Sequence, residues 1–427
     1  MEIKAVSNPF WMWFARPWPQ LVAGILCMAM IANLQYGWTL FVAPIDAKYH
    51  WGRSAIQVAF TIFVFAETWL VPVKAWFVDR HNPRMVVMVG GVLVTVAWVL
   101  NSFADSLILL YIAAAIGGAG AAAVYGSCVG NALKWFPRRR GMAAGFTAAG
   151  FGAGAALTVV PISRMIDSSG YESAFLTFGI LQGAVILCAA MLLRKPTDSQ
   201  MSAAGRRRTS EQDSRPHQAV RTPVFWVMYL TFVLIAAGGL IAAAQIGPIA
   251  KDYGIGGTPV SLLGLTLPAL TFAISLDRIF DGFGRPLFGF ISDRIGREVT
   301  MALAFTTAAG ALFIFDQYGH DPVVFVLSSA MFFFVFGEIY SLFPATCGDT
   351  FGASYATTNA GMLYTAKGTA SLLVPFASVL SANGNWHLVF QVSMAASLCA
   401  AVMALLVMRP LRARFLSERL GNAGAKP

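Results

Sequence analysis

The sequence predicts an all-α polytopic membrane protein with twelve transmembrane helices in two pseudo-symmetric six-helix halves. Three observations support this prediction. Hydrophobic residues make up 57% of the 427 residues and charged residues only 12%, whereas soluble domains carry about 45–50% apolar and about 25% charged residues. Apolar runs of about 20 residues, the length that crosses a bilayer, recur along the whole chain. One polar segment near the middle divides these runs into two groups of six.

The polar segment contains Ser, Gln, Asp, Arg and Pro and no apolar run, so we expect it to be a cytoplasmic linker. The predicted domains are a six-helix half over 1–193, the linker over 194–222, a second six-helix half over 223–409 and a cytoplasmic tail over 410–427. The twelve expected helices cover residues 20–44, 54–78, 84–103, 106–132, 141–164, 172–193, 223–249, 258–291, 298–315, 321–347, 355–382 and 387–408.

The Lys and Arg residues predict the orientation in the membrane. With the N-terminus in the cytoplasm, about 22 of them lie on the cytoplasmic side and about 4 on the other, as the positive-inside rule requires. We therefore expect a multi-pass protein of the cell (inner) membrane with both termini cytoplasmic, no signal peptide and a monomeric state. The net charge of +10 then reflects topology and the lipid bilayer, so no nucleic-acid partner is predicted.

Cysteine and histidine spacing predicts neither an enzyme nor a metalloprotein. The five cysteines have no paired spacing and the five histidines have no metal-ligand spacing, so we expect no disulfide framework, no metal and no other cofactor. The chain also lacks a G-x-x-x-x-G-K-[ST] loop for ATP phosphates. We therefore predict no catalytic residues.

Landmark residues recur between the two halves at nearly one offset. An Asp-Arg pair follows the second expected helix of each half, and the two pairs lie about 214 positions apart, which favours a duplicated unit. Two such halves, related by an axis along the membrane normal, place a binding site between them near the midplane. The other landmarks are Tyr125, Phe136, Gly145 and Gly152 in the first half and Tyr340, Phe351, Gly361 and Gly368 in the second.

Residues Gly289–Arg297 match the G-x-x-x-D-R-x-G-R loop of the major facilitator superfamily, which the chain resembles. In that family the loop is a cytoplasmic gate. The first copy departs from the motif, with Ala75 in place of the leading Gly and Asn82-Pro83 in place of the later Gly-Arg. The gating residues that the resemblance implies are Asp79, Arg80, Arg84, Asp293, Arg294 and Arg297.

Further segments resemble the oxalate:formate antiporter family, and the likeness covers nearly the whole chain apart from the linker and tail. The resemblance implies a secondary active transporter of small carboxylates that works by alternating access. It would exchange a dicarboxylate such as oxalate for a monocarboxylate such as formate, driven by gradients rather than by ATP. The family includes transporters of several carboxylates, so the resemblance does not select one. The segments are Gln35–Leu40, Lys134–Pro137 with Gly145–Gly150, Gly284–Pro286 and Ala366–Ser371.

Arg285 and Lys367 are the strongest candidates for binding an anion. A charged residue costs about 2.5–3.5 kcal/mol at a helix centre, so a functional role is expected for those within the spans. Arg supplies a bidentate fork for a carboxylate and Lys a point charge. Lys367 has no acidic neighbour within a helical turn, so we expect it to be unpaired. The resemblance also implies that these two residues bind substrate carboxylates. The alternative is an Arg285–Asp281 bridge with Lys367 reaching towards the membrane surface.

Asp277, Asp281 and Arg285 fall on one stripe of the eighth expected helix, with Arg278 beside it. The Asp-x-x-x-Arg spacing resembles that of proton-coupled monocarboxylate transporters, where the Asp takes the proton and the Arg takes the carboxylate. Two roles stay open for Asp281: coupling to protons, or holding Arg285 in place. We expect Asp277 and Arg278 to form a structural pair. The alternative function is thus a proton-coupled symporter of lactate, pyruvate or formate.

Three further charges fall within the expected helices. Glu67 and Lys74 lie seven residues apart on the second helix and support the cavity or the gate, with Lys74 reaching towards the membrane surface. Glu338 is expected to pair with Lys367 or Arg285 in one conformational state. Aromatic residues and one amide complete the predicted substrate site, because phenol groups donate hydrogen bonds to carboxylates. These residues are Gln35, Tyr36, Trp38, Tyr125, Tyr340 and Tyr364.

Overall fold

The computed structural model is almost entirely helical, with one short β-hairpin in the part of the chain that it describes. Three residues with predicted roles, Lys74, Asp79 and Arg80, lie outside that part, as do linker residues 198–212. The described residues are 14, 16–71, 82–197, 213–262, 264–373 and 386–424.

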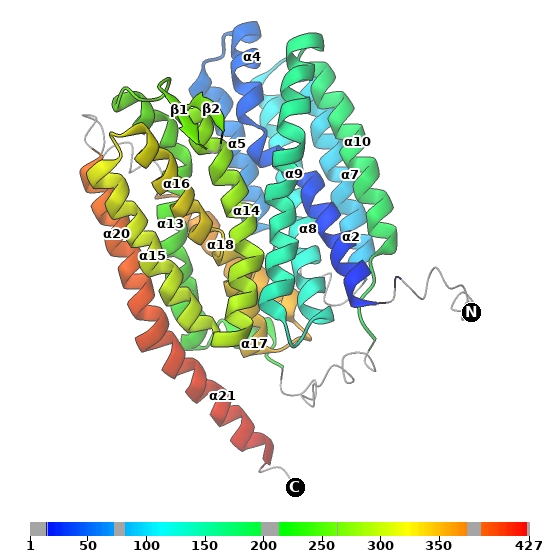
Figure 1. The fold of residues 1–427 in the computed structure, drawn as a ribbon. Helices are drawn as coiled ribbons and strands as arrows, with labels where there is room; N and C mark the ends of the chain where they lie inside the picture. The colour runs from blue at the N-terminus through cyan, green and yellow to red at the C-terminus, as the bar shows by residue number, and fades with distance from the viewer. Residues whose placement is uncertain are drawn as a thin grey trace, which may run out of the picture.

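The helices up to α10 gather on one side of the molecule, blue to green in Figure 1, and are called the N-terminal bundle. Its first span is built from three successive helices, and its other described helices follow the expected order. The elements are α2 (Pro17–Ile31), α3 (Asn33–Tyr36), α4 (Thr39–Tyr49), α5 (Arg53–Trp69), α7 (Pro83–Ser102), α8 (Leu107–Trp135), α9 (Arg140–Ser169) and α10 (Tyr171–Leu192).

The remaining helices form the C-terminal bundle on the other side, green to red in Figure 1. The last helix continues beyond the bundle, so residues that were expected to form a tail are helical as far as Gly424. The elements are α12 (Pro216–Ala219), α13 (Pro223–Asp252), α14 (Ala269–Ile295), α15 (Arg297–Tyr318), α16 (Pro322–Phe336), α17 (Ile339–Phe351), α18 (Ala356–Ser371), α20 (His387–Val402), the π-helical η3 (Met403–Met408) and α21 (Arg409–Gly424).

Local sequence explains where several helices begin. Pro83, Pro223 and Pro322 each occupy a first helical position, where a missing N–H costs nothing and the fixed φ suits the helix. Side chains immediately before these helices complete the caps: the Asp321 carboxylate accepts hydrogen bonds from two backbone N–H groups of α16. The Thr222 hydroxyl accepts one from α13.

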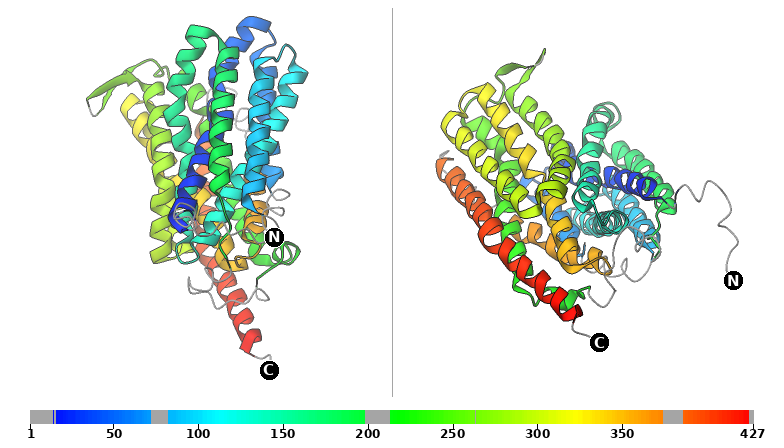
Figure 2. Two further views of the ribbon diagram at one scale, coloured as in Figure 1. Left: turned by 90° about the vertical axis from the view of Figure 1, so that its right-hand side faces the viewer. Right: turned by 60° about the horizontal axis from the view of Figure 1, so that its bottom comes forward.

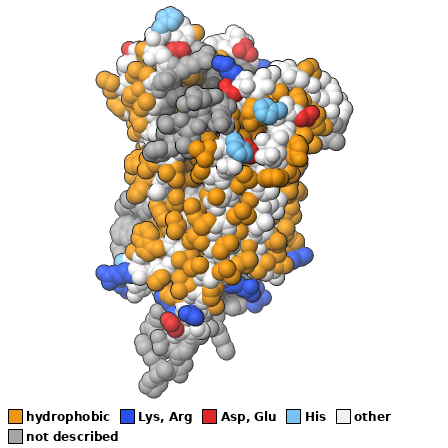
Figure 3. Space-filling view, turned by 90° about the vertical axis from the view of Figure 1, so that its left-hand side faces the viewer, with side chains coloured by type: hydrophobic (Ala, Val, Ile, Leu, Met, Phe, Trp, Pro, Cys, Tyr) orange, Lys and Arg blue, Asp and Glu red, His pale blue; other side chains and the backbone are white. Residues whose placement is uncertain are grey.

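Eight helical stretches within the described residues are long and apolar enough to cross a membrane. The other four expected spans contain α5, α9, α14 and α18, and these helices form the contact between the bundles: α9 packs on α14, and α5 packs on α18. A face that meets protein does not need the apolarity of one that meets lipid. Figure 3 shows the contrasting outer face, an apolar band with Lys and Arg gathered at its lower end.

The predicted helix over 258–291 is wrong in its first part. Residues Pro259–Leu262 (β1) and Leu265–Pro268 (β2) form an antiparallel hairpin in which Val260 lies opposite Leu267. Gly264 has a φ of +80° in the connection, and the helix begins only after Pro268. A short apolar run does not by itself distinguish a strand from a helix, so the turn glycine and flanking prolines were the better signal.

The expected span over 321–347 is interrupted at its centre. The α-helix stops at Phe336 and resumes at Ile339, leaving Gly337 and Glu338 between α16 and α17. A Cβ at Gly337 would lie 2.5 Å from the backbone oxygen of Asp281, so only glycine permits this approach of α14. Both residues keep right-handed helical φ and ψ, so α16 and α17 follow one another as a single span across this turn.

Small residues bring α9 and α14 into backbone contact across the two bundles. A Cβ at Gly145 of α9 would lie 2.4 Å from the backbone oxygen of Arg285. In the same way, a Cβ at Gly289 of α14 would lie 2.1 Å from the backbone oxygen of Gly141. Close approach of this kind lets two helices gain van der Waals packing without a hydrophobic driving force.

We expect Gly145→Ala to destabilise the protein and Gly282→Ala to leave its stability equal or higher. A Cβ at Gly145 forces α9 away from α14, and overpacking of this kind costs about 1–3 kcal/mol. A Cβ at Gly282, also on α14, meets nothing within 4 Å, while Ala favours the helix by about 1 kcal/mol. Thermal unfolding of the purified proteins in detergent measures both. Equal melting temperatures for the two variants would contradict the close contact.

Candidate functional site

Arg285 lies between the two bundles and is bound to both of them. Its side chain is 2% exposed. Nη2 donates to Oδ2 of Asp281 at 2.6 Å, one turn earlier on α14. Nη1 donates to the backbone oxygen of Ala148 on α9 at 2.8 Å, and Nη2 approaches the Tyr36 hydroxyl of α3 at 3.4 Å. The guanidinium is therefore neutralised from its own helix and positioned by the N-terminal bundle.

Lys367 of α18 pairs with Glu67 of α5, which corrects the expectation of an unpaired cation. Nζ of Lys367 donates to Oε2 of Glu67 at 3.1 Å and to the Tyr364 hydroxyl at 2.9 Å. Glu67 is 0% exposed, and its Oε1 accepts from the same hydroxyl at 3.2 Å. Oε1 of Gln35 lies 3.5 Å from the ammonium. Glu67 belongs to the other bundle, so the sequence around Lys367 gives no sign of this pairing.

Tyr340 brings the two cations into one site. The guanidinium carbon of Arg285 lies 4.5 Å from the centre of the Tyr340 ring, and Nζ of Lys367 lies 5.8 Å from it. The two charges are therefore separated by no more than about 10 Å. Both lie within about 6 Å of the centre of the same aromatic ring, the range of a cation–π interaction. Tyr340 is buried in the first turn of α17, directly after the break in the span.

Aromatic rings from both bundles surround the two ion pairs. Tyr125 of α8 stacks on Tyr364 of α18, with ring centres 4.5 Å apart and an angle of 24° between their planes. Tyr36 and Tyr125 both contact Phe151 of α9 edge to face. Phe151 was not among the predicted residues, since a phenylalanine in an apolar helix carries no signal beyond packing. Burial of these rings excludes water and strengthens the local electrostatics.

Other predicted residues lie near the cluster without the expected pairings. Arg278 lies over the Tyr36 and Phe333 rings, at 4.7 and 5.7 Å, and no ion pair joins it to Asp277 in the described structure. Neither oxygen of Glu338 has a hydrogen-bond partner among the described residues, so the pairing with Lys367 or Arg285 that was expected in one conformational state is not made in this conformation. Trp38 is buried, and its indole nitrogen is likewise without a described partner.

A second charged network closes one end of the contact between the bundles. Asp293 of α14 accepts hydrogen bonds from the backbone N–H groups of Gly141 and Met142 in α9, at 3.0 and 2.9 Å. Its carboxylate also pairs with Arg297 at 2.6 Å. A carboxylate at a helix N-terminus satisfies free N–H groups and interacts favourably with the helix dipole. Asp293 therefore joins α14 to α9 across the two bundles, and Arg297 pairs with its carboxylate.

Two members of this network were missed by the sequence argument. Asp349 of α17 binds Arg140 of α9 at 3.0 Å and Arg297 at 2.9 Å, so it joins cations from both bundles. The side chain of Arg140 is 1% exposed, so this basic residue at the start of α9 is buried in the network. The network lies near α21, because Arg412 donates to the Thr350 hydroxyl at 2.9 Å.

Two predicted gating residues lie outside the network. Arg294 is exposed and lies over the Phe290 ring at 4.1 Å. Arg84 is half-buried at the start of α7, and its Nε has no hydrogen-bond partner in the described structure. A motif specifies which residues recur, but only the packing of the helices decides which of them meet.

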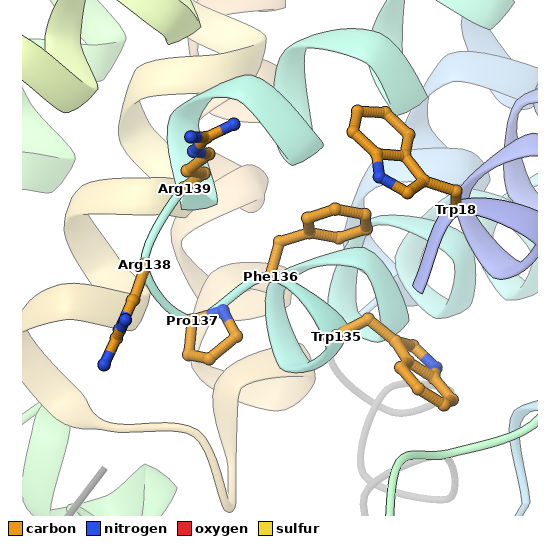
Figure 4. A pocket seen from close by; sticks show the side chains of 6 residues that line it. All are labelled: Trp18, Trp135, Phe136, Pro137, Arg138 and Arg139. Atoms are coloured by element: carbon orange, nitrogen blue, oxygen red, sulfur yellow. The ribbon is translucent and has the colours of Figure 1, made fainter. Parts of the chain in front are cut away.

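A surface pocket of about 260 Å³ lies away from the buried cluster, where α8 turns into α9 (Figure 4). Trp18 of α2 closes one side and meets Phe136 edge to face with ring centres 5.3 Å apart. Within the described residues, no group of three or more His, Cys, Asp or Glu side chains is placed to hold a metal ion. The lining residues of the pocket are Trp18, Trp135, Phe136, Pro137, Arg138 and Arg139.

Comparison with known proteins identifies the family. The sequence profile of the Major Facilitator Superfamily matches residues 25–375 and 279–427. The chain belongs to the Major Facilitator Superfamily. Within that superfamily, the oxalate:formate antiporter of Oxalobacter formigenes is 34% identical over 392 residues, which cover 91% of each chain. This match confirms the predicted membership of the oxalate:formate antiporter family.

One further relative and one solved structure are also similar to the chain. Monocarboxylate transporter 11 of Mus musculus is 27% identical over 281 residues, 62% of this chain and 57% of the relative. The proton:xylose symporter XylE has the same fold, with a TM-score of 0.74 at 11% identity over 92% of this chain and 96% of its own. The chain is therefore a multi-pass membrane transporter of the major facilitator fold, and not an enzyme.

We expect Asp293→Ala to loosen the start of α9. The variant loses the cap on Gly141 and Met142, which is worth about 1 kcal/mol or more, so amide hydrogen exchange in residues 139–145 should be about fivefold faster or more. Hydrogen-exchange mass spectrometry of the purified protein measures this. Asp321→Ala is the matched control, because it removes the cap of α16 alone. Unchanged exchange at the start of α9 in Asp293→Ala would contradict a closed gate here.

Proposed function

We propose that the chain is a secondary active transporter of small carboxylate anions that works by alternating access, most like an antiporter of a dicarboxylate such as oxalate against a monocarboxylate such as formate. One observation carries the proposal: two buried cations, Arg285 and Lys367, meet at the ring of Tyr340 between the bundles. Their separation, at most about 10 Å, is within the distance that a small dianion with hydrogen bonds of about 3 Å at each end can bridge.

The two cations suit different parts of such an anion. The planar fork of Arg285 binds one carboxylate in a bidentate manner, and the ammonium of Lys367 takes the other as a point charge. Phenol groups of Tyr36 and Tyr364, which already contact these cations, donate further hydrogen bonds to the bound anion. The rings enclose the substrate and exclude water, which strengthens both contacts.

The position of the charged network supports alternating access. The network of Asp293, Arg297, Arg140 and Asp349 holds α9 against α14 and α17 at the end of the molecule nearest α21. We assign this end of the molecule to the cytoplasmic side of the cell (inner) membrane, with both termini there. The reason is that Lys and Arg are concentrated at this end, as the positive-inside rule requires. The bundles then rock about the central site, and the opposite end closes as the gate opens.

The relatives support the substrate class. The relative that matches 91% of the chain is named as an oxalate:formate antiporter, and a further relative is named as a monocarboxylate transporter. Both names describe carriers of small organic acids. The two-cation site favours the first, since a dicarboxylate uses both charges and a monocarboxylate uses one.

A second candidate function is proton-coupled symport of a monocarboxylate such as lactate, pyruvate or formate. The observation that favours it is the Asp281–Arg285 pair, at 2.6 Å and 2% exposed on both sides. A monocarboxylate that binds Arg285 would leave Asp281 without its counter-charge, and Asp281 would then take a proton. The monocarboxylate transporter relative supports this alternative.

Arg285→Gln and Lys367→Gln are each expected to reduce oxalate uptake into formate-loaded proteoliposomes by at least about 30-fold. Each variant leaves a carboxylate of the anion without its buried partner, a loss of about 2 kcal/mol or more. Lys251→Gln, an exposed lysine at the end of α13, is the matched control and should exchange like the wild type. Normal exchange in both buried-site variants would refute the two-cation site.

A pH gradient separates the two functions. The symporter accumulates a monocarboxylate into empty vesicles when the outside is acidic, whereas the antiporter requires a carboxylate inside. If symport is correct, Asp281→Asn should abolish accumulation driven by the gradient while retaining exchange of labelled substrate. Uptake that depends on internal carboxylate and does not respond to the pH gradient would exclude the symporter and favour the antiporter.

A further inference from the structure

Arg278 of α14 differs from the two cations of the proposed substrate site in its partners. Arg285 is bound to an acid of its own helix and Lys367 to Glu67, so an anion that binds Lys367 competes with Glu67. In the described structure the guanidinium of Arg278 makes neither an ion pair nor a hydrogen bond, although the adjacent Asp277 attracts it through space. A cation at membrane depth needs protein, water or an anion as its partner.

The position of Arg278 on α14 relates it to Arg285. The two residues are seven apart, which is almost two full turns of a helix and an advance of about 10 Å, so they share one face. The charged network lies at the far end of α14, at Asp293 and Arg297. An anion that approaches while this network is closed therefore reaches the level of Arg278 before that of Arg285.

The side chain of Tyr36 connects the two arginines. The guanidinium carbon of Arg278 lies 4.7 Å from the centre of the Tyr36 ring, and the Tyr36 hydroxyl lies 3.4 Å from Nη2 of Arg285. Arg278 also approaches the ring of Phe333 in α16, at 5.7 Å. The two rings belong to opposite bundles, so Arg278 lies at the contact between the bundles, as Arg285 does.

These contacts leave the binding groups of Arg278 available to an anion. An aromatic ring attracts a guanidinium through its charge and does not accept its N–H groups as a carboxylate does. The fork of N–H donors matches the geometry of a carboxylate. Arg278 is also partly exposed, whereas Arg285 is 2% exposed. A cation on the approach to a binding site concentrates anions there and increases their rate of association.

We propose that Arg278 is a first binding site for the substrate anion, on the side of the central site that faces away from the charged network. This inference rests on the proposed function and adds a third cation to it. One carboxylate of the incoming anion binds the guanidinium of Arg278. The anion then moves along Tyr36 by two helical turns to Arg285 and Lys367, where both of its ends are bound.

Neutral substitutions of Arg278 test the proposal. Arg278→Gln removes the charge, and Arg278→Met does so while keeping an aliphatic chain against the rings, so either variant serves if the other does not fold. Right-side-out membrane vesicles loaded with formate take up labelled oxalate through the outer face of the protein. We expect each variant to raise the KM for oxalate about tenfold or more, the effect of one lost hydrogen bond to a charged group. The Vmax should stay close to that of the wild type.

Three comparisons separate binding from a structural role. Everted vesicles take up oxalate through the cytoplasmic face, where the KM of the Arg278 variants should equal that of the wild type. Arg278→Lys should give a KM between those of the wild type and Arg278→Gln, because a point charge replaces the fork. Arg164→Gln removes an exposed arginine near the corresponding end of α9 and should leave the KM unchanged.

Several results would overturn the inference. One is an unchanged KM in right-side-out vesicles with Arg278→Gln or Arg278→Met, whether or not the Vmax falls, because a merely structural role would reduce the amount of active protein alone. Another is an equal rise of the KM in everted vesicles, and a third is an equal rise with Arg164→Gln, which would indicate a general effect of surface charge.

The inference and the proposed function fail in different ways. If the wild-type protein does not exchange oxalate for formate, the proposed function is wrong and the role of Arg278 falls with it. If Arg285→Gln and Lys367→Gln abolish exchange while Arg278→Gln keeps the KM of the wild type, the proposed function stands and only the first binding site is wrong.

Discussion

The pairing of charge between the two bundles is the constraint on which the rest of the structure depends. A charged group inside a membrane protein must face protein or water and must have a partner. Here Lys367 is neutralised by a carboxylate from the opposite bundle, and Arg285 is positioned by a backbone oxygen and a phenol from that bundle. The charges therefore serve two roles: they hold the bundles together and they mark the place where an anion can bind.

The helices at this contact are built differently from those that face lipid. α9 and α14 approach to backbone contact at Gly145 and Gly289, and the absence of a side chain at Gly337 makes room for α14 beside Asp281. At one end the capped start of α9 and the Asp349 network close the contact. Each of these contacts is a polar bond or a close approach of small residues, and those made by α9 lie between the two bundles. That property suits a carrier that alternates between two conformations.

Composition and periodicity predicted the membrane-spanning class, and the motifs predicted the family. Those signals are local, because an apolar run or a gating loop is contiguous in sequence. The Glu67–Lys367 pair was missed because its partners lie 300 residues apart. Asp349 was missed for the same reason: its role depends on meeting Arg140 of the other bundle. The hairpin at Pro259–Pro268 was missed because an apolar run of this length suits either a strand or a helix, and turn chemistry decided between them.

The central claim is that one anion binds to both buried cations and displaces Glu67. An experimental structure of the protein in the presence of oxalate tests it most directly. The account predicts an anion in contact with Arg285 and Lys367 beside the Tyr340 ring, with Glu67 no longer bound to the ammonium. Oxalate bound elsewhere, or bound while the contact between Glu67 and Lys367 is retained at about 3 Å, would contradict it.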